Sequence, residues 1–221
     1  MDVRVRLETE DDYREVEELT REAFWNLYVP GCDEHYLCHV LRGHRDFIKE
    51  LDFVAEADGR IVGSIMYSKS VLIGDDGDTR QIVSFGPLCV HPDFQRRGIG
   101  SLLIDKTKAI LGASDIPAIV IYGDPHNYCK HGFKNGMDCK VSDMDGDYPL
   151  GLLVLELKSG FFGNKKWKAM QSDVFKYGPD EAAEFDKGFA RKEKKWQYSQ
   201  ELFRMQIRSF LREAPLEFAS T

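Results

Sequence analysis

The spacing of hydrophobic and polar positions changes along the chain and predicts where its strands and helices lie. Residues 3–7 alternate between apolar and charged side chains, which is typical of a β-strand with one buried face. Apolar residues then recur at helical spacing over 13–27, and this run ends at Pro30-Gly31. A second helix is predicted from about 35 to 49. The chain therefore starts with one strand followed by two amphipathic helices.

A β-meander is predicted after these helices. Residues 53–57 form a mainly apolar strand and are followed by Asp58-Gly59, a dipeptide that favours a tight hairpin turn. Residues 61–73 form the return strand, and residues 80–90 form the fourth strand. These strands are expected to pair antiparallel in chain order.

One parallel strand pair is expected in the next part of the chain. A helix predicted over 99–111 connects the fourth strand to the apolar strand 118–122, and such a crossover is right-handed and joins parallel strands. Shorter strands are predicted at 141–142 and 152–157. The predicted fold class is therefore α/β (α+β), with a mixed, mostly antiparallel central sheet flanked by helices.

The loop after the fourth strand combines glycines with two arginines in the run Gln95-Arg96-Arg97-Gly98-Ile99-Gly100. It opens a predicted helix, whose first N–H groups lack internal partners and whose dipole favours an anion at that end. Gly98 and Gly100 carry no Cβ, so a bulky phosphate can approach the backbone closely. Arg96 and Arg97 would add positive charge at the rim. The loop is predicted to be a diphosphate cradle.

Two common nucleotide-binding motifs do not fit this loop, because no lysine follows Gly100 and no glycine stands at 90–93. The loop resembles instead the acetyl-coenzyme A signature Q/R-x-x-G-x-G/A of the GNAT superfamily of N-acetyltransferases. Residues 86–95 resemble the strand and turn that precede this signature. Downstream, Tyr128-Cys129-Lys130-His131-Gly132-Phe133 is similar to the Y-x-K-x-G-F ending of the same superfamily. The segment 123–128 most resembles the corresponding segment in a small bacterial-type subgroup of predicted N-acetyltransferases.

The resemblance implies a GNAT-like fold in which strands four and five splay apart and hold the pantetheine arm of acetyl-CoA between them. It implies acetyl-CoA as the co-substrate and direct transfer, in a ternary complex, to a primary amine of a small molecule or protein. Tyr128 is the catalytic residue so implied, protonating the leaving thiolate. The implied cofactor-binding residues are Leu88, Cys89, Val90, Gln95, Arg96, Arg97, Gly98, Ile99, Gly100 and Ser101.

Other functions and the identity of the base stay open at this point. The same cradle would serve a longer-chain acyltransferase, or a CoA-binding sensor or interaction module without turnover. Many members of the superfamily carry a carboxylate on the fourth strand, but residues 81–86 contain none. His126, Asp124 and Glu56 are candidates for the general base, and none of them is assigned that role.

Residues 1–163 are expected to form the N-acetyltransferase domain, and residues 164–221 a C-terminal helical extension. The extension carries a broad apolar stripe over 198–212, so it is expected to pack on the same domain or at a homodimer interface. Residues 187–212 contain eight basic and two acidic side chains, which is typical of a solvated helical face.

The overall composition narrows the partners and the compartment. The net charge of −7 argues against nucleic acid as a partner, and no window is apolar enough for a membrane span. Five cysteines with irregular spacing fit reduced thiols, and the N-terminus has no apolar signal region, so a cytoplasmic location is expected. Five Cys and His side chains over 32–44 have spacings that can bind zinc, but an amphipathic helix explains them and no metal is expected.

Overall fold

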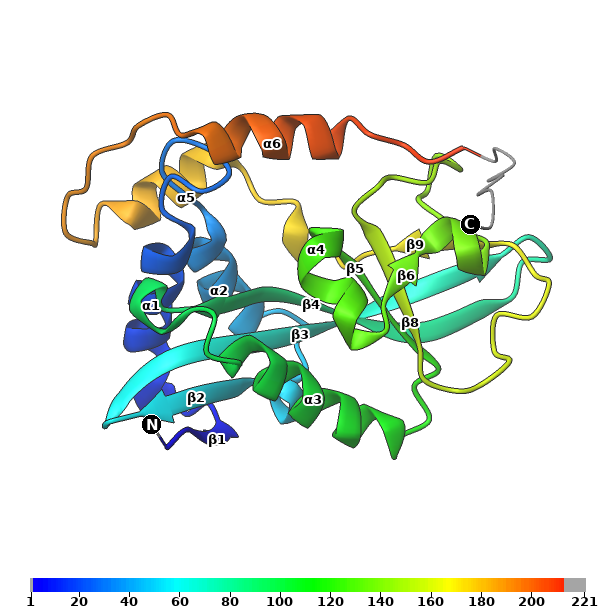
Figure 1. The fold of residues 1–221 in the computed structure, drawn as a ribbon, viewed down its shortest axis with the longest axis horizontal. Helices are drawn as coiled ribbons and strands as arrows, with labels where there is room; N and C mark the ends of the chain where they lie inside the picture. Colours follow the sequence, from blue (N-terminus) through cyan, green and yellow to red (C-terminus); the bar gives the residue numbers. More distant parts are fainter. Residues whose placement is uncertain (1, 213–221) are drawn as a thin grey trace, which may run out of the picture.

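The computed structural model describes residues 2–212, which form a nine-stranded sheet with helices on both faces (Figure 1). The main strand order is β1-β2-β3-β4-β5-β8-β6, and β9 pairs with both β3 and β7. The strands are β1 (Arg4–Leu7), β2 (Phe53–Ala57), β3 (Arg60–Gly74), β4 (Thr79–Val90), β5 (Ala118–Tyr122), β6 (Lys134–Asn135), β7 (Val141–Ser142), β8 (Leu152–Glu156) and β9 (Trp167–Met170).

Six α-helices and six short 3-10 helices are present among the described residues. The α-helices are α1 (Tyr13–Phe24), α2 (Glu34–Arg42), α3 (Ile99–Gly112), α4 (Pro125–Tyr128), α5 (Pro179–Asp186) and α6 (Tyr198–Ile207). The 3-10 helices are η1 (Glu10–Asp12), η2 (Lys49–Leu51), η3 (Pro92–Phe94), η4 (Cys129–His131), η5 (Gly136–Cys139) and η6 (Asp173–Phe175). Within residues 2–212, no helix combines the length and apolar character needed to cross a bilayer.

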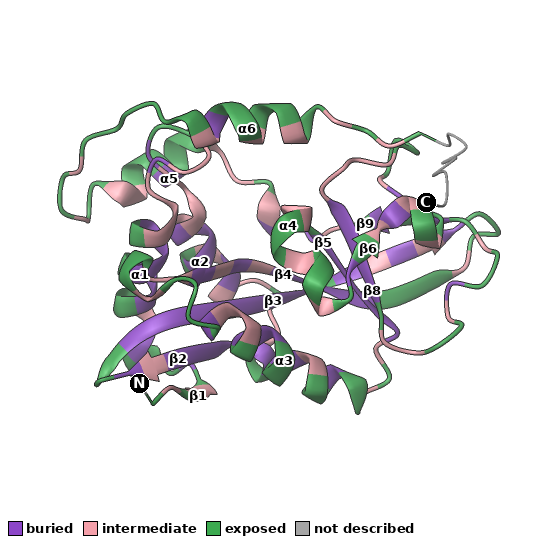
Figure 2. Cartoon of the chain, in the orientation of Figure 1, coloured by how far each residue is buried: buried purple, intermediate pink, exposed green. Residues whose placement is uncertain are grey.

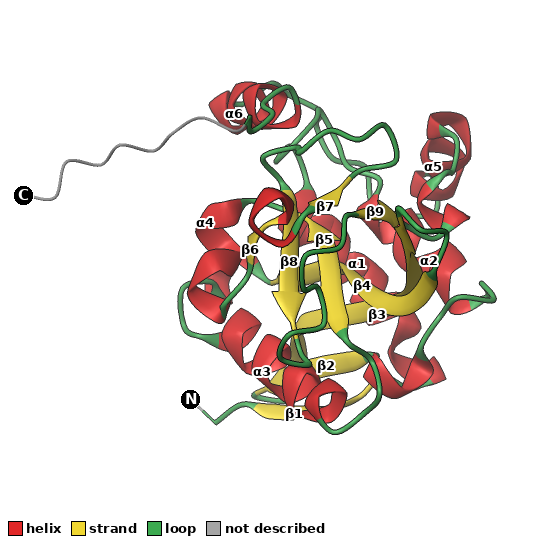
Figure 3. Ribbon diagram, turned by 90° about the vertical axis from the view of Figure 1, so that its right-hand side faces the viewer, coloured by secondary structure: helices red, strands yellow, loops and turns green. Residues whose placement is uncertain are grey.

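Two apolar layers hold helices against opposite faces of the sheet (Figure 3). On one face, α3 contributes Leu103 and Leu111 to a cluster with strand residues such as Ile65. On the other face, α1 and α2 contribute residues such as Val16 and Leu41 to a second cluster. Figure 2 shows the result as buried central strands beneath helices whose outer faces are exposed.

The predicted fold class is confirmed, because neighbouring strands are antiparallel except for the expected parallel pair β4–β5 and a second parallel pair, β7–β9, that was not predicted. The second helix is shorter than predicted, because α2 ends at Arg42 and Gly43 occupies its C-cap. The chain then turns back onto the sheet, where the Ile48 N–H donates to the Tyr67 carbonyl at 3.0 Å. Ile48 therefore packs against the core from a turn, which helical periodicity could not distinguish from a helix.

The expected C-terminal extension does not consist of helices alone. Its first regular element is β9, which pairs antiparallel with β3 from Val71↔Met170 to Gly74↔Trp167. Strand β9 is short and lies among charged residues, so its sequence pattern does not identify it as a strand. Its pairing with β3 does. After β9, helix α5 contacts α1, where the Arg21 guanidinium lies 2.6 Å from Asp186 of α5. Residues 213–221 of the extension lie outside the described residues.

A buried cluster of charges joins α1 and α2 to the start of the chain. The Arg42 guanidinium lies 2.6 Å from the Glu8 carboxylate and 2.9 Å from the Glu17 carboxylate, and all three side chains are buried. Asp52 lies beside Glu8, and burial together with that neighbouring carboxylate raises the pKa of Asp52 to about 9. Arg42 thus supplies positive charge where buried acids converge, and buried charges are tolerated only when they are paired in this way.

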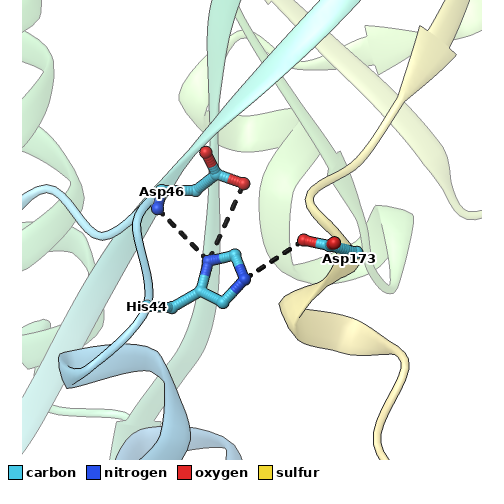
Figure 4. Close-up of side chains that lie close together, drawn as sticks. All are labelled: His44, Asp46 and Asp173. Atoms are coloured by element: carbon cyan, nitrogen blue, oxygen red, sulfur yellow. Dashed lines mark hydrogen bonds and ion pairs between the residues drawn. The ribbon is translucent and has the colours of Figure 1, made fainter.

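A second polar cluster ties the turn after α2 to η6 (Figure 4). His44 accepts the Asp46 backbone N–H at its Nδ1 atom, and its Nε2 atom lies 3.1 Å from Asp173. Among the described residues, only His44, Asp46 and Asp173 have the geometry of a metal-binding group. Asp173 also binds Arg45 at 2.7 Å, so these atoms are engaged with one another.

The Cys and His side chains over 32–44 do not converge on one point. Cys32 lies 3.6 Å from His35, but Cys38 contacts Thr20 and His39 pairs with Glu17. Their sequence spacing therefore reflects helix packing.

Candidate active site

Strands β4 and β5 separate after a single paired position. Val83 pairs with Ile119, and beyond this pair the two strands diverge. On its other side β4 contains a β-bulge, because Leu88 pairs with Ile65 while Phe85 pairs with Tyr67. Gly86 and Pro87 fill the bulge, and Pro87 has no N–H to donate to the sheet. The sheet is thus opened where the sequence leads into the glycine-containing loop.

A cavity of about 1010 Å³ occupies this opening. One wall comes from β4 and the start of α3, and a second comes from the turn after β5 and from α4. A third wall comes from α1, α2 and α6. Of the residues expected to bind a cofactor, all but Arg97 line the cavity, namely Leu88, Cys89, Val90, Gln95, Arg96, Gly98, Ile99, Gly100 and Ser101.

Cys89 and Gln95 also make contacts within the protein at this wall of the cavity. The Cys89 side chain is buried, and its sulfur lies 3.4 Å from the Thr20 hydroxyl of α1. Burial raises the pKa of the Cys89 thiol to about 12, which leaves it as an inert packing group. The Gln95 amide donates to the Val90 carbonyl at 3.2 Å, an interaction that anchors the loop to the end of β4.

The cradle loop has the backbone geometry that its glycines suggested. Gly98 is the N-cap of α3 and has a left-handed backbone with φ of +84°. Its carbonyl accepts the Leu102 N–H at 2.9 Å, which starts the helix. The N–H groups of the first turn consequently have no partner inside α3 and are available to an anion.

Gly98→Ala is expected to lower the free energy of unfolding by about 1 kcal/mol, because a left-handed backbone is costly for a residue with a Cβ. A Cβ at this position meets no atom within 4 Å, so the effect is conformational and not a clash. Urea unfolding measures the change. Gly112→Ala at the end of α3, where a Cβ is also uncrowded, is the matched control and should leave stability unchanged or raise it. Equal destabilisation by both variants would contradict a backbone origin of the effect.

Tyr128 ends α4 and faces the same cavity. Its ring packs against Phe85 and Phe133, with ring centroids 5.6 and 6.0 Å away. Gly123 is required beside it, because a Cβ there would lie 2.5 Å from the tyrosine ring. Burial raises the pKa of Tyr128 well above its usual value, with smaller effects from Tyr28 and Asp124. The phenol therefore keeps its proton at neutral pH.

The candidate bases proposed from the sequence occupy different places. Asp124 and His126 line the cavity, and the Asp124 carboxylate accepts the His126 backbone N–H at 2.9 Å. Glu56 lies on β2, pairs with Arg6 at 3.0 Å and does not line the cavity. Glu56 is therefore removed from the set of candidates.

Glu34, a carboxylate that is not among the candidates from the sequence, lines the cavity from the first turn of α2. Its Oε2 atom accepts the Asp33 backbone N–H at 3.2 Å. Burial, with a smaller effect from Asp33, raises the pKa of Glu34 to about 7. Glutamate is common in the first turn of a helix, so no sequence signal distinguished this one.

Helix α6 lies along the upper edge of the molecule in Figure 1. Three of its residues line the cavity, namely Phe203, Gln206 and Ile207. The Phe203 ring packs against Tyr28, with centroids 4.6 Å apart. The Gln206 side chain donates to the Gly123 carbonyl at 3.0 Å. The C-terminal extension is thus joined both to the segment after α1 and to the turn after β5.

Comparison with known proteins agrees with this architecture. Residues 50–135 match the family described as "Acetyltransferase (GNAT) domain". The chain is 30% identical over 131 residues to "Uncharacterized N-acetyltransferase ycf52" of Gracilaria tenuistipitata var. liui, an alignment that covers 55% of this chain and 68% of the relative. The chain therefore belongs to the GNAT family of N-acetyltransferases, and the resemblance seen in its sequence is confirmed.

Two solved structures of similar fold contain the coenzyme. The GNAT family N-acetyltransferase YhbS of Escherichia coli, in complex with CoA, has a TM-score of 0.68 and 21% identity, over 79% of this chain and 92% of that one. A GNAT family acetyltransferase of Brucella melitensis, in complex with acetyl-CoA, has a TM-score of 0.60 and 24% identity, over 79% and 98% of the two chains. These likenesses establish the fold.

Proposed function

We propose that this chain transfers an acetyl group from acetyl-CoA to a primary amine. The observation that carries the proposal is the single cavity shared by the cradle loop, the open stretch of β4 and Tyr128. Relatives of the same fold bind CoA or acetyl-CoA, which supports this choice of co-substrate.

Each part of the cavity has a role in this proposal. The free N–H groups at the start of α3 and the Arg96 guanidinium bind the diphosphate of the coenzyme. The open edge of β4 around Leu88 and Val90 binds the pantetheine arm, and a backbone N–H there stabilises the oxyanion. The amine nitrogen attacks the thioester carbon, the C–S bond breaks, and the departing thiolate takes the Tyr128 proton.

The five cysteines are all free thiols, which supports the cytoplasm as the compartment in which the protein acts.

Calorimetry with acetyl-CoA, run beside an assay of CoA thiol release over a panel of amines, tests the proposal. The expected result is binding together with amine-dependent release, and mass spectrometry should find the acetylated amine. Binding without release would favour a sensor, and faster release from longer acyl-CoA substrates would favour a longer-chain acyltransferase. Absence of binding would contradict the proposed function.

A further inference from the structure

Glu34, which is partly buried in the cavity wall, differs from three buried carboxylates near α1 and α2 that each have a cation partner. Glu8 and Glu17 both pair with Arg42, and Asp12 pairs with Arg6. Within residues 2–212, no lysine, arginine or histidine nitrogen lies at ion-pair distance from Glu34. A carboxylate removed from water is costly unless a cation compensates it. Glu34 is therefore an acidic group of the cavity whose counter-charge the protein itself does not supply.

Apolar side chains share the cavity with Glu34. Phe24 and Leu27 line it from α1 and the turn that follows, and Leu37 lines it one helical turn beyond Glu34 on α2. The Tyr28 ring stands between Phe24 and Phe203, with centroids 5.8 and 4.6 Å away. Aromatic faces attract organic cations and exclude water from apolar groups. This surface suits a ligand that carries both an ammonium group and an apolar body.

Both basic and acidic residues line the cavity. The basic residues Arg96 and Lys130 come from the cradle loop and from the segment after α4. Besides Glu34, acidic residues come from the turn after β5 and the segment after β7, namely Asp124 and Asp143. An anionic coenzyme is attracted to the basic group, whereas a second ligand that carries its own carboxylate would be repelled by the acidic one.

We propose that Glu34 binds the ammonium group of the acceptor and removes a proton from it, and that the acceptor is a small primary amine with an apolar body and no carboxylate. This inference rests on the proposed acetyltransferase function. Helix α6 belongs to the same cavity wall as Glu34 and narrows access to it, which favours a small molecule over a folded protein. The position of Glu34 on α2 also accounts for the missing carboxylate on β4.

The proton balance is complete with these groups. The acceptor ammonium gives one proton to the Glu34 carboxylate, and the neutral nitrogen attacks the thioester carbon. When the C–S bond breaks, the thiolate takes the Tyr128 proton. The second proton on nitrogen returns to the Tyr128 oxygen, and Glu34 releases its proton to solvent. The products are the amide and the free thiol of CoA.

The expected pH dependence follows from the ionisation of Glu34. Only the deprotonated carboxylate can bind the ammonium group and accept its proton. Because burial raises the pKa of Glu34 to about 7, kcat/KM should fall as pH drops below about 7. If this carboxylate had the pKa of an ordinary exposed glutamate, kcat/KM would fall only near pH 4.

The experiment uses two pairs of amines that differ by one carboxylate: phenethylamine with phenylalanine, and hexylamine with 6-aminohexanoate. Phenethylamine and hexylamine should be acetylated at least tenfold faster than their partners. Glu34→Gln should lower kcat/KM for phenethylamine by about 100-fold, remove the change near pH 7 and leave acetyl-CoA affinity unchanged. Glu34→Asp, which keeps the carboxylate, should still show the fall in kcat/KM on the acidic side of the pH profile. Glu18→Gln, on the exposed face of α1 where Glu18 pairs with Arg14, is the control.

Each contrary result has a separate meaning. Equal rates within each amine pair, or a wild-type pH profile in Glu34→Gln, would overturn the inference. Acetyl-CoA binding by the wild type with no binding or acetylation of phenethylamine and hexylamine would also overturn it, and would leave the proposed function standing. Failure of the wild type to bind acetyl-CoA would instead contradict the proposed function. Thermal unfolding of each variant, and its calorimetric acetyl-CoA affinity, identify any loss caused by misfolding.

Discussion

Tyr128→Phe is expected to lower kcat by about 100-fold and to leave KM for acetyl-CoA nearly unchanged. The substitution removes one hydroxyl and keeps the ring that packs between Phe85 and Phe133, so the cavity wall should stay in place. The effect should fall on kcat because the hydroxyl gives up its proton only as the C–S bond breaks. Steady-state kinetics with phenethylamine and acetyl-CoA measure both constants.

The raised pKa of Tyr128 both favours and opposes its role as the general acid. It guarantees that the phenol is protonated at neutral pH, but it also makes the phenol a weak acid toward a thiolate in water. Transfer becomes favourable only because the thiolate forms in the same partly desolvated space, where its own charge is costly. Tyr198→Phe, at an exposed position on α6, removes a comparable hydroxyl and should leave kcat unchanged. An unaltered kcat in Tyr128→Phe would exclude it as the general acid.

Arg42→Ala is expected to lower the free energy of unfolding by about 3–5 kcal/mol. The loss should be large because Glu8 and Glu17 would remain buried without the guanidinium that lies 2.6 and 2.9 Å from them. The Arg42 guanidinium also lies over the Tyr13 ring, 4.1 Å from its centroid, and this contact would be lost as well. Urea denaturation monitored by circular dichroism measures the change.

Arg45→Ala provides a matched comparison three residues away. Arg45 also binds a carboxylate, Asp173 at 2.7 Å, but both side chains are exposed and water screens their attraction. This variant should unfold at nearly the same urea concentration as the wild type. If Arg42→Ala were equally mild, Arg42 would not be the group that stabilises the buried carboxylates, and water or protonation would have to compensate their charge instead.

The elements that the sequence predicted well are those whose causes are local. Strand β5 and the long helix α3 are continuous in sequence, so their apolar periodicity is sufficient to define them. The boundary of α2 depended on Gly43 and on the hydrogen bond from Ile48 to the distant strand β3. Strand β9 has only four residues, and its identity as a strand comes from pairing with residues 71–74 nearly one hundred positions earlier.

The sequence by itself determined the GNAT family, because the motifs that carry the resemblance are short runs of residues. It also predicted the glycine-containing loop and Tyr128 as parts of the site, and both line the cavity. The tertiary structure decided which carboxylate enters the cavity. Glu34 and Phe203 are 169 positions apart, and they line one space because α6 packs on the segment after α1, where Phe203 contacts Tyr28. Burial there is the main cause of the raised pKa of Glu34, and burial depends on the whole fold, whereas the neighbouring Asp33 has a smaller effect.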